Sequence, residues 1–146
     1  MIDLTIDTRI ARPAADVFGY VTDPELLPTW QTNTISSVPD GPLAVGTRLR
    51  EVHRAPGGKE LASLVEITEY EPGRAFALHV VEGTPVDLRI TLERADGGTL
   101  MRFRAFGRLT GVMRLAQPLL GRVLRRQFAR QCETLKRLLE TQAVPA

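Results

Sequence analysis

The shortness of the segments between predicted strands is the feature that most constrains the fold of this chain. From residue 33 to residue 108, apolar and polar residues alternate in stretches that are typical of half-buried strands. The intervening segments are rich in glycine, proline and aspartate, which favour tight turns. A parallel connection needs about a dozen residues or more, so these short connections predict antiparallel neighbours. The expected strands span residues 33–38, 47–54, 60–70, 75–82, 85–94 and 99–108.

Another strand and two short helices are predicted before this region. Residues 2–10 alternate cleanly between apolar and polar side chains and predict a half-buried strand. Apolar residues at helical spacing follow, and they predict a short helix with Pro13 as its first residue. Asp23 can cap a second short helical turn, which begins at Pro24 and is limited by Pro28.

Residues 111–140 predict one long amphipathic helix. Apolar residues recur three or four positions apart, while most of the arginines fall on the other face. Pro118 predicts a bend or break near Gln117. A twisted sheet of seven antiparallel strands cannot cover its own apolar face, and this helix is the obvious cover. We therefore expect an α+β fold, with a curved seven-stranded antiparallel sheet and two short helices between its first and second strands.

Length and cysteine content limit the number of domains and the compartment that this chain fits. A chain of 146 residues is long enough for one domain with a sizeable core, which we expect to cover residues 1–142, with a frayed tail at residues 143–146. Cys132 is the only cysteine, so no intramolecular disulfide can form and a reducing, cytoplasmic location fits best. The sequence shows neither a signal-peptide pattern nor an apolar run of about 18 residues, so we expect neither secretion nor a membrane span.

Charge is unevenly distributed along the chain. From Thr99 onward there are ten lysines and arginines and two glutamates, a net charge of +8, whereas the whole chain carries +2. Such a split fits either an anionic partner or the ordinary solvated face of a helix. We expect no nucleic-acid partner, because the basic helix offers no exposed aromatic residues between its arginines. The other hypothesis for a partner is peripheral contact with a membrane through Arg122, Arg126 and Arg130.

Four stretches, which follow one another along most of the chain, carry a resemblance to a known superfamily. They are RPAADVFGYVTDPELLPTW, VGTRLRE, VEITEYEPGRAF and LLGRVLRRQFARQCETLKRLLE. The chain resembles the START-like superfamily, also called SRPBCC, and within it the bacterial polyketide cyclase/dehydrase-like branch. The resemblance implies a helix-grip fold, in which a curved sheet wraps around the long C-terminal helix at a deep apolar cavity. It also implies a hydrophobic ligand, such as a lipid, a polyketide or an aromatic compound, but it carries over no catalytic residue.

The strand at residues 47–54 holds the most informative polar side chains. Its alternation places Leu49, Glu51 and His53 on one face and three arginines on the other. Burying unpaired arginines is costly, so the arginine face should be exposed and Glu51 should point into the cavity. The other side chains expected to line the cavity are Trp30, Phe76, Leu78, Val80, Leu88, Ile90, Met101, Phe103, Leu120, Leu124 and Phe128.

Glu51 and His53 allow three interpretations. A buried carboxylate beside a histidine can transfer protons as a general acid/base pair, or it can orient a polar group of a ligand. In the third interpretation Glu51 only pairs with an arginine or a backbone group, and His53 is exposed near the turn that follows. Trp30 likewise either lines the mouth of the cavity or anchors a short helix in the core.

The remaining candidate residues are expected to be structural. Alternation directs His79 outward, Tyr70 ends a strand, and Cys132 lies on the apolar stripe of the helix as a buried, inert thiol. Two histidines and one cysteine that are far apart give no zinc-site spacing, so we expect neither a metal nor a cofactor.

Three functions are compatible with these features. The first is binding of a hydrophobic small molecule without catalysis. The second is a cyclase or dehydratase that acts on a polyketide-like substrate, with Glu51 or His53 moving protons. The third is a lipid or quinone carrier at a membrane surface. Either a monomer or a homodimer is expected.

Overall fold

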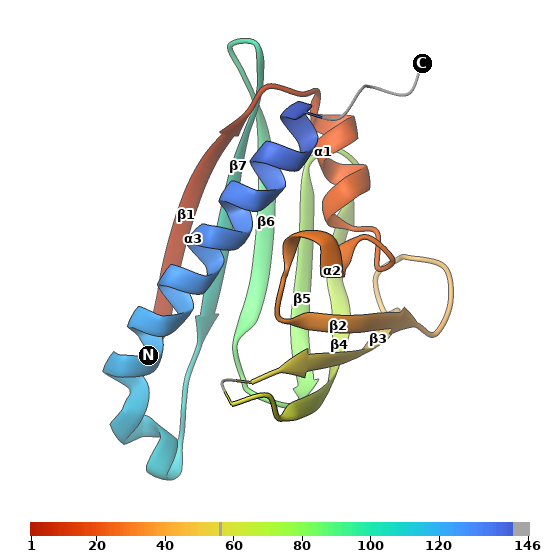
Figure 1. The fold of residues 1–146 in the computed structure, drawn as a ribbon. Helices are drawn as coiled ribbons and strands as arrows, with labels where there is room; N and C mark the ends of the chain where they lie inside the picture. The colour runs from red at the N-terminus through yellow and green to blue at the C-terminus, as the bar shows by residue number, and fades with distance from the viewer. Residues whose placement is uncertain (56, 142–146) are drawn as a thin grey trace.

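Seven antiparallel strands form one curved sheet, and a long helix lies across its concave side (Figure 1). This computed structural model of the protein describes residues 1–55 and 57–141. The strands are β1 (Ile2–Ile10), β2 (Thr34–Pro39), β3 (Arg48–Arg54), β4 (Glu60–Glu71), β5 (Ala75–Glu82), β6 (Asp87–Ala95) and β7 (Gly98–Gly107). The helices are α1 (Ala14–Val21), α2 (Leu27–Trp30), the 3-10 helix η1 (Gly111–Ala116) and α3 (Gln117–Thr141). The expected α+β architecture is confirmed.

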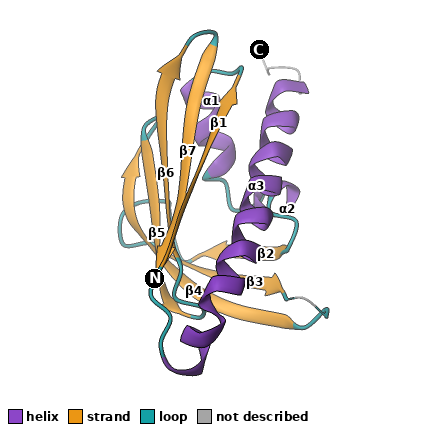
Figure 2. Ribbon diagram, turned by 90° about the vertical axis from the view of Figure 1, so that its left-hand side faces the viewer, coloured by secondary structure: helices purple, strands orange, loops and turns teal. Residues whose placement is uncertain are grey.

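The strand order explains the shape of the sheet. The order is β1-β7-β6-β5-β4-β3-β2, so β1 and β2 are the two edges. Consecutive strands from β2 to β7 are neighbours, as the short connections predict, and only β1 joins from the start of the chain. Figure 2 shows β2 and β3 curving out from the sheet toward the side on which α3 lies.

The two faces of the sheet carry different side chains. Inward-facing residues such as Ile90, Met101 and Phe103 are buried beneath the helix. On the outer face, arginines pair with carboxylates of neighbouring strands and lower the pKa of each of these carboxyl groups. These exposed pairs are Asp3–Arg104, Asp7–Arg102 and Glu69–Arg89, with N–O distances of 2.8–2.9 Å.

Helix α3 is held to the sheet by an apolar stripe on its C-terminal half. Phe128, Cys132, Leu135 and Leu139 are buried there. The ring of Phe128 packs on that of Phe103, with 5.0 Å between the ring centres. Burying one large apolar side chain contributes about 1.5–3 kcal/mol, so this stripe is a main source of the attachment.

Polar contacts from α3 also cover the end of the edge strand β1. Lys136 Nζ donates a hydrogen bond to the carbonyl oxygen of Arg9 at 2.5 Å. Just beyond the strand, the backbone N–H of Ala11 donates to Glu140 Oε2 at 2.8 Å. Unpaired strand edges can pair with other chains, and these contacts satisfy two of the backbone groups at this edge.

A buried arginine joins the N-terminal and C-terminal parts of the chain. Arg12 Nη1 donates to the carbonyl oxygen of Leu139 at 2.6 Å, near the end of α3. Its Nη2 donates to Asp16 Oδ2 in α1 at 3.0 Å. The hydroxyl of Thr99 donates to the carbonyl oxygen of Arg12 at 2.7 Å. These contacts fix α1, α3 and β7 relative to one another.

The break expected near Gln117 is confirmed, and two other details of the expected helices are corrected. Residues 111–116 form the 3-10 helix η1, and α3 begins at Gln117. Pro13 precedes α1 as its N-cap residue, and Pro28 lies inside the first turn of α2 instead of ending it. Proline is tolerated in a first turn because the N–H that it lacks would have no intrahelical partner there.

Two further points concern membrane spans and the tail. Within residues 1–55 and 57–141, no helix has the length and apolar character needed to cross a bilayer. The fraying expected for residues 143–146 falls outside the described residues.

Gly98 provides a test of the packing at the start of β7. A Cβ atom on this glycine would collide with the carbonyl oxygen of Ile10 and lie 2.9 Å from Ala11 Cα. We expect Gly98→Ala to lower the free energy of unfolding by about 2 kcal/mol or more, measured by urea denaturation. Gly19→Ala in α1 is the matched control, because nothing lies within 4 Å of its Cβ position. That control should raise the free energy of unfolding by roughly 0.5–1 kcal/mol. Equal effects of the two substitutions would contradict the close packing around Gly98.

Candidate functional site

The inward face of β3 carries a buried carboxylate. Leu49 and Glu51 are only 4% and 5% exposed, whereas Arg48 and Arg50 on the opposite face are exposed. The prediction that the arginine face of this strand points outward is therefore confirmed. His53 also points inward but lies near the end of the strand, where its side chain is 28% exposed.

Both oxygens of Glu51 have polar partners. Glu51 Oε1 lies 3.2 Å from His53 Nε2, and Glu51 Oε2 accepts a hydrogen bond from Ser37 Oγ at 3.0 Å. No arginine forms an ion pair with Glu51 among the described residues. The partners of this buried carboxylate are thus a histidine and a hydroxyl, which hold it in place.

A β-bulge in β2 brings two hydroxyls to this face. Thr34 lies opposite His53 and Ser37 lies opposite Glu51, with an irregular register between Thr34 and Ser36. In a regular strand, residues three apart point to opposite faces. The bulge adds one residue to the strand and so lets Thr34 and Ser37 share the inward face.

The hydrogen bonds continue from His53 to the end of α2. Thr34 Oγ1 lies 3.1 Å from His53 Nδ1 and donates its proton to Gln31 Oε1 at 3.1 Å. In that arrangement Thr34 Oγ1 accepts from His53 Nδ1–H, so the Thr34 hydroxyl links the histidine to Gln31. The network therefore fixes the orientation of the imidazole ring beside Glu51.

A second polar region lies where α2 and the loop after it meet α3. Gln131 Nε2 on α3 donates to Asn33 Oδ1 at 2.9 Å. Trp30 is fully buried, and neither its Nε1–H nor Gln131 Oε1 has a hydrogen-bond partner within the described residues. Buried polar groups almost always have partners, so one donor and one acceptor here are suited to a bound polar group or water.

The expected apolar lining divides into a buried part and an accessible part. Phe76, Ile90, Met101, Phe103 and Phe128 are buried in the core, together with Leu49 and Trp30. Five other expected lining residues pack against that core but stay partly exposed; they are Leu78, Val80, Leu88, Leu120 and Leu124. The three on strands, Leu78, Val80 and Leu88, point inward. These five side chains therefore keep part of their apolar surface accessible to solvent.

Sequence reasoning missed five polar residues of the site, which are Gln31, Asn33, Thr34, Ser37 and Gln131. Thr34 and Ser37 were hidden because the period-two pattern of a strand does not reveal a bulge. Asn33 lies in a short loop without a distinctive motif. Gln131 did carry a signal, because it is a polar residue on the buried stripe of α3.

The other candidate residues lie outside this region or are inert. His79 is exposed on the outer face and pairs with Asp87 at 2.9 Å, as its alternation predicts. Tyr70 packs edge-on against Phe18 and Phe76, with ring-centre distances of 5.4 and 6.1 Å. Three or more His, Cys, Asp or Glu side chains placed to hold a metal do not occur in the described part of the chain.

Comparisons with known proteins agree with this architecture. A family model described as polyketide cyclase/dehydrase and lipid transport matches residues 1–140. The di-domain ARO/CYC StfQ from the steffimycin biosynthetic pathway superposes with a TM-score of 0.80 at 14% identity, over 95% of this chain and 50% of that one. For Ara h 8.0201 the TM-score is 0.73 at 16% identity, over 96% and 98% of the two chains. The Aha1 dimer from Colwellia psychrerythraea gives 0.69 at 17% identity, over 97% and 98%. No curated protein matches the sequence, and these low identities establish the fold alone.

Ser37 tests the network around the buried carboxylate. Ser37→Ala leaves Glu51 Oε2 without its donor, which should lower the free energy of unfolding by about 1–3 kcal/mol in urea denaturation. Ser36→Ala, at the preceding residue, is the control. Its free energy of unfolding is expected to change by no more than about 0.5 kcal/mol. Equal effects of the two substitutions would show that the Ser37–Glu51 hydrogen bond adds nothing to stability.

Cys132 gives a prediction about reactivity and pH. Burial raises the pKa of its thiol to about 12, while a hydrogen bond with Thr8 acts weakly in the opposite direction. The thiol stays protonated in the folded protein, so a disulfide reagent at about pH 8 should label it only after denaturation. Because the folded pKa is the higher one, stability should fall as pH rises from about 9 toward 12, and Cys132→Ala should remove that dependence. Rapid labelling of the folded protein would contradict the burial of this group.

Proposed function

The chain belongs to the polyketide cyclase/dehydrase and lipid transport family, and we propose that it binds a hydrophobic small molecule between its sheet and α3. The proposed site combines the accessible apolar side chains of β5, β6 and α3 with the polar groups of β2, β3 and α2. In this proposal the protein acts in the cytoplasm, as a monomer or a homodimer.

The observation that carries the proposal is the combination of partly exposed apolar side chains with buried polar atoms that have no hydrogen-bond partner among the described residues. Leu78 and Leu88 are cross-strand partners that point inward yet remain partly exposed. Such a surface in a monomer favours an apolar occupant. The Nε1–H of Trp30 and Oε1 of Gln131 supply one donor and one acceptor in the same interior. Together they suit a mostly apolar lipid, polyketide or aromatic compound that carries a hydroxyl or carbonyl group.

Glu51 has an orienting role in this proposal. Its carboxylate is buried and is held in place by Ser37 and His53. A ligand hydroxyl that approaches the pair can donate to Glu51 or accept from His53, which fixes its direction. The affinity comes mainly from the apolar contacts, and the polar pair selects which end of the ligand enters.

A second candidate function is a cyclase or dehydratase, and the Glu51–His53 pair is the observation that favours it. The two groups are 3.2 Å apart and can share one proton. In cyclisation the pair would take a proton from the carbon beside a ketone, and in dehydration it would return a proton to the departing hydroxyl. Both steps need the reacting atoms within hydrogen-bond reach of the pair. The name of the structural neighbour StfQ, an ARO/CYC protein, is consistent with this chemistry.

A lipid or quinone carrier that works at a membrane surface is a special case of ligand binding. It needs, besides the site, a surface that contacts the bilayer, for which Arg122, Arg126 and Arg130 are the candidates named from the sequence.

Native mass spectrometry of freshly purified protein tests the proposed function. We expect a population that is heavier than the chain by one small molecule, which solvent extraction removes. Trp30→Phe and Glu51→Gln should each weaken rebinding of the extracted molecule by about tenfold, because each removes one polar contact. Arg50→Gln, on the outer face of the same strand, is the control and should bind normally. Absence of a bound molecule, combined with no binding of oleate or an apolar dye, would exclude the proposal.

The same variants separate binding from catalysis. If the protein is a cyclase or dehydratase, Glu51→Gln and His53→Ala should lower turnover of a poly-β-ketone substrate by about a hundredfold or more. Turnover by both variants at the parental rate would exclude the pair from catalysis.

A further inference from the structure

The end of the molecule formed by η1 and the first turns of α3 exposes apolar side chains that the fold does not cover. No residue of η1 is buried. Val112 and Leu115 are each 84% exposed, and Leu119 is 68% exposed. Met1, which is also 68% exposed, lines a pocket beside η1. Single exposed apolar residues are ordinary on a protein surface, but a group of them marks a contact surface.

The same end is strongly basic. The sequence has no aspartate or glutamate between Asp96 and Glu133. On the outer face of the sheet, arginines such as Arg89 and Arg102 pair with carboxylates. At this end, by contrast, four exposed arginines form no ion pair with any described residue; they are Arg108, Arg114, Arg122 and Arg125. Unpaired guanidinium groups around an apolar group of side chains favour an anionic partner.

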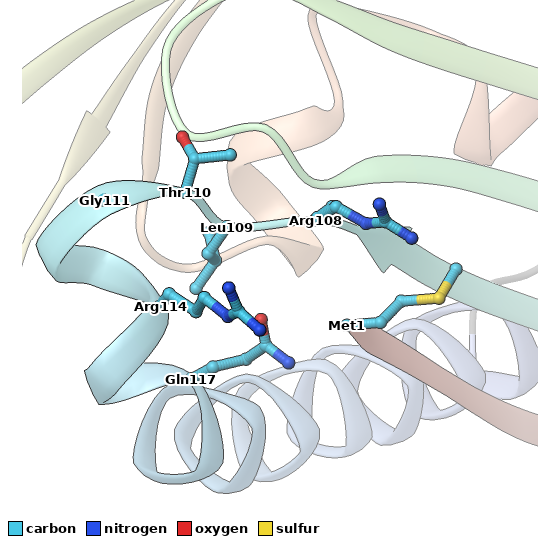
Figure 3. Close-up of a pocket in the computed structure, with 7 residues that line it drawn as sticks. All are labelled: Met1, Arg108, Leu109, Thr110, Gly111, Arg114 and Gln117. Atoms are coloured by element: carbon cyan, nitrogen blue, oxygen red, sulfur yellow. The ribbon is translucent and has the colours of Figure 1, made fainter.

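A pocket joins these two features (Figure 3). It has a volume of about 410 Å³ and lies between the end of β7, η1 and the start of α3. Arg114 and Gln117 line it from the helical side, while Arg108 and Met1 line it from the strands. Guanidinium and amide N–H groups are good donors to phosphate oxygens. We call the exposed residues of this end the η1 surface, which comprises Met1, Arg108, Val112, Arg114, Leu115, Leu119 and Arg122.

We propose that the η1 surface docks the protein onto an anionic lipid bilayer. Val112, Leu115 and Leu119 enter the boundary between headgroups and acyl chains, and the surrounding arginines bind lipid phosphates. The combination of protruding apolar residues with basic neighbours is the pattern of proteins that lie on a membrane without crossing it. Each arginine near an anionic surface strengthens the attachment, and salt weakens it.

Charge argues against a second copy of the chain as the occupant of this surface. A symmetric dimer through the η1 surface would place the arginines of one copy against those of the other. The surface itself contains no carboxylate that could balance them. Like charges facing each other oppose association, whereas anionic lipid headgroups complement them.

Docking in this orientation would also serve the proposed ligand site, although the docking itself does not depend on that site. Leu120 and Leu124 follow directly on α3 and belong to the accessible apolar part of the concave side. A bilayer bound at Leu119 therefore lies next to the side chains over which a hydrophobic ligand would enter.

Vesicle sedimentation with the full chain tests the docking. Vesicles of phosphatidylcholine with about 30% phosphatidylglycerol should bind the protein at low salt, and about 0.5 M sodium chloride should release much of it. Pure phosphatidylcholine vesicles should bind at least about tenfold more weakly. The triple variants V112S/L115S/L119S and R108Q/R114Q/R122Q should each lose about tenfold or more in affinity. Because these side chains are exposed, both variants should keep the circular dichroism spectrum and melting temperature of the parent.

Two matched controls separate docking from general stickiness or charge. V38S/V45S/L61S removes exposed apolar side chains elsewhere, and R50Q/R74Q/R94Q removes three exposed arginines elsewhere. Both controls should bind vesicles nearly as well as the parent. In Leu115→Trp the new indole should shift its fluorescence to the blue on anionic vesicles, while the buried Trp30 gives a constant background.

Several outcomes would overturn the proposal. One is absence of binding to the anionic vesicles, and another is equal loss of binding in the η1-surface variants and their controls. A third is a parent protein that is dimeric and becomes monomeric in V112S/L115S/L119S, since a second copy would then cover the surface. If the protein does not bind vesicles but a co-purified ligand is found, only the docking proposal is wrong. If the protein binds vesicles but holds no ligand, only the proposed ligand site is wrong.

Discussion

The packing of α3 on the concave face of the sheet is the contact on which the rest of the structure depends. An antiparallel sheet with one apolar face is stable only when another element covers that face. The C-terminal half of α3 provides this cover through Phe128, Cys132, Leu135 and Leu139. None of the residues from Gln117 to Gln127 is buried. One end of the helix is therefore structural, and the other end leaves apolar side chains accessible.

The candidate site and the η1 surface both lie away from this contact. Glu51 and its partners lie on β2 and β3, at the opposite edge of the sheet from β1, along which α3 packs. A buried carboxylate there adds little to packing and is costly to bury, although Ser37 and His53 offset part of the cost. The Nε1–H of Trp30, which has no hydrogen-bond partner in the described part of the chain, has the same character. Polar groups of this kind are typical of places where stability has been given up for function.

The sequence was sufficient for the fold because its local signals agree with the tertiary contacts. Alternation along β3 separates Glu51 from Arg50, and the cost of burying arginine then decides which face points inward. The same reasoning correctly directed His79 outward and Cys132 into the core. The features that the sequence did not reveal depend on contacts between distant parts of the chain. The bulge that turns Ser37 inward arises from the pairing of β2 with β3. The exposure of Leu119 arises because the first turns of α3 are not covered by the sheet.

The central claim is that a hydrophobic molecule occupies the interior next to Trp30, and the indole N–H of that residue tests it most directly. Trp30 is the only tryptophan, so a nitrogen–proton correlation spectrum of the labelled protein contains a single indole signal. On titration with the molecule that co-purifies, or with an apolar dye, this signal should move downfield as Nε1–H gains an acceptor. A ligand that binds stoichiometrically and leaves the indole signal unchanged would contradict the account.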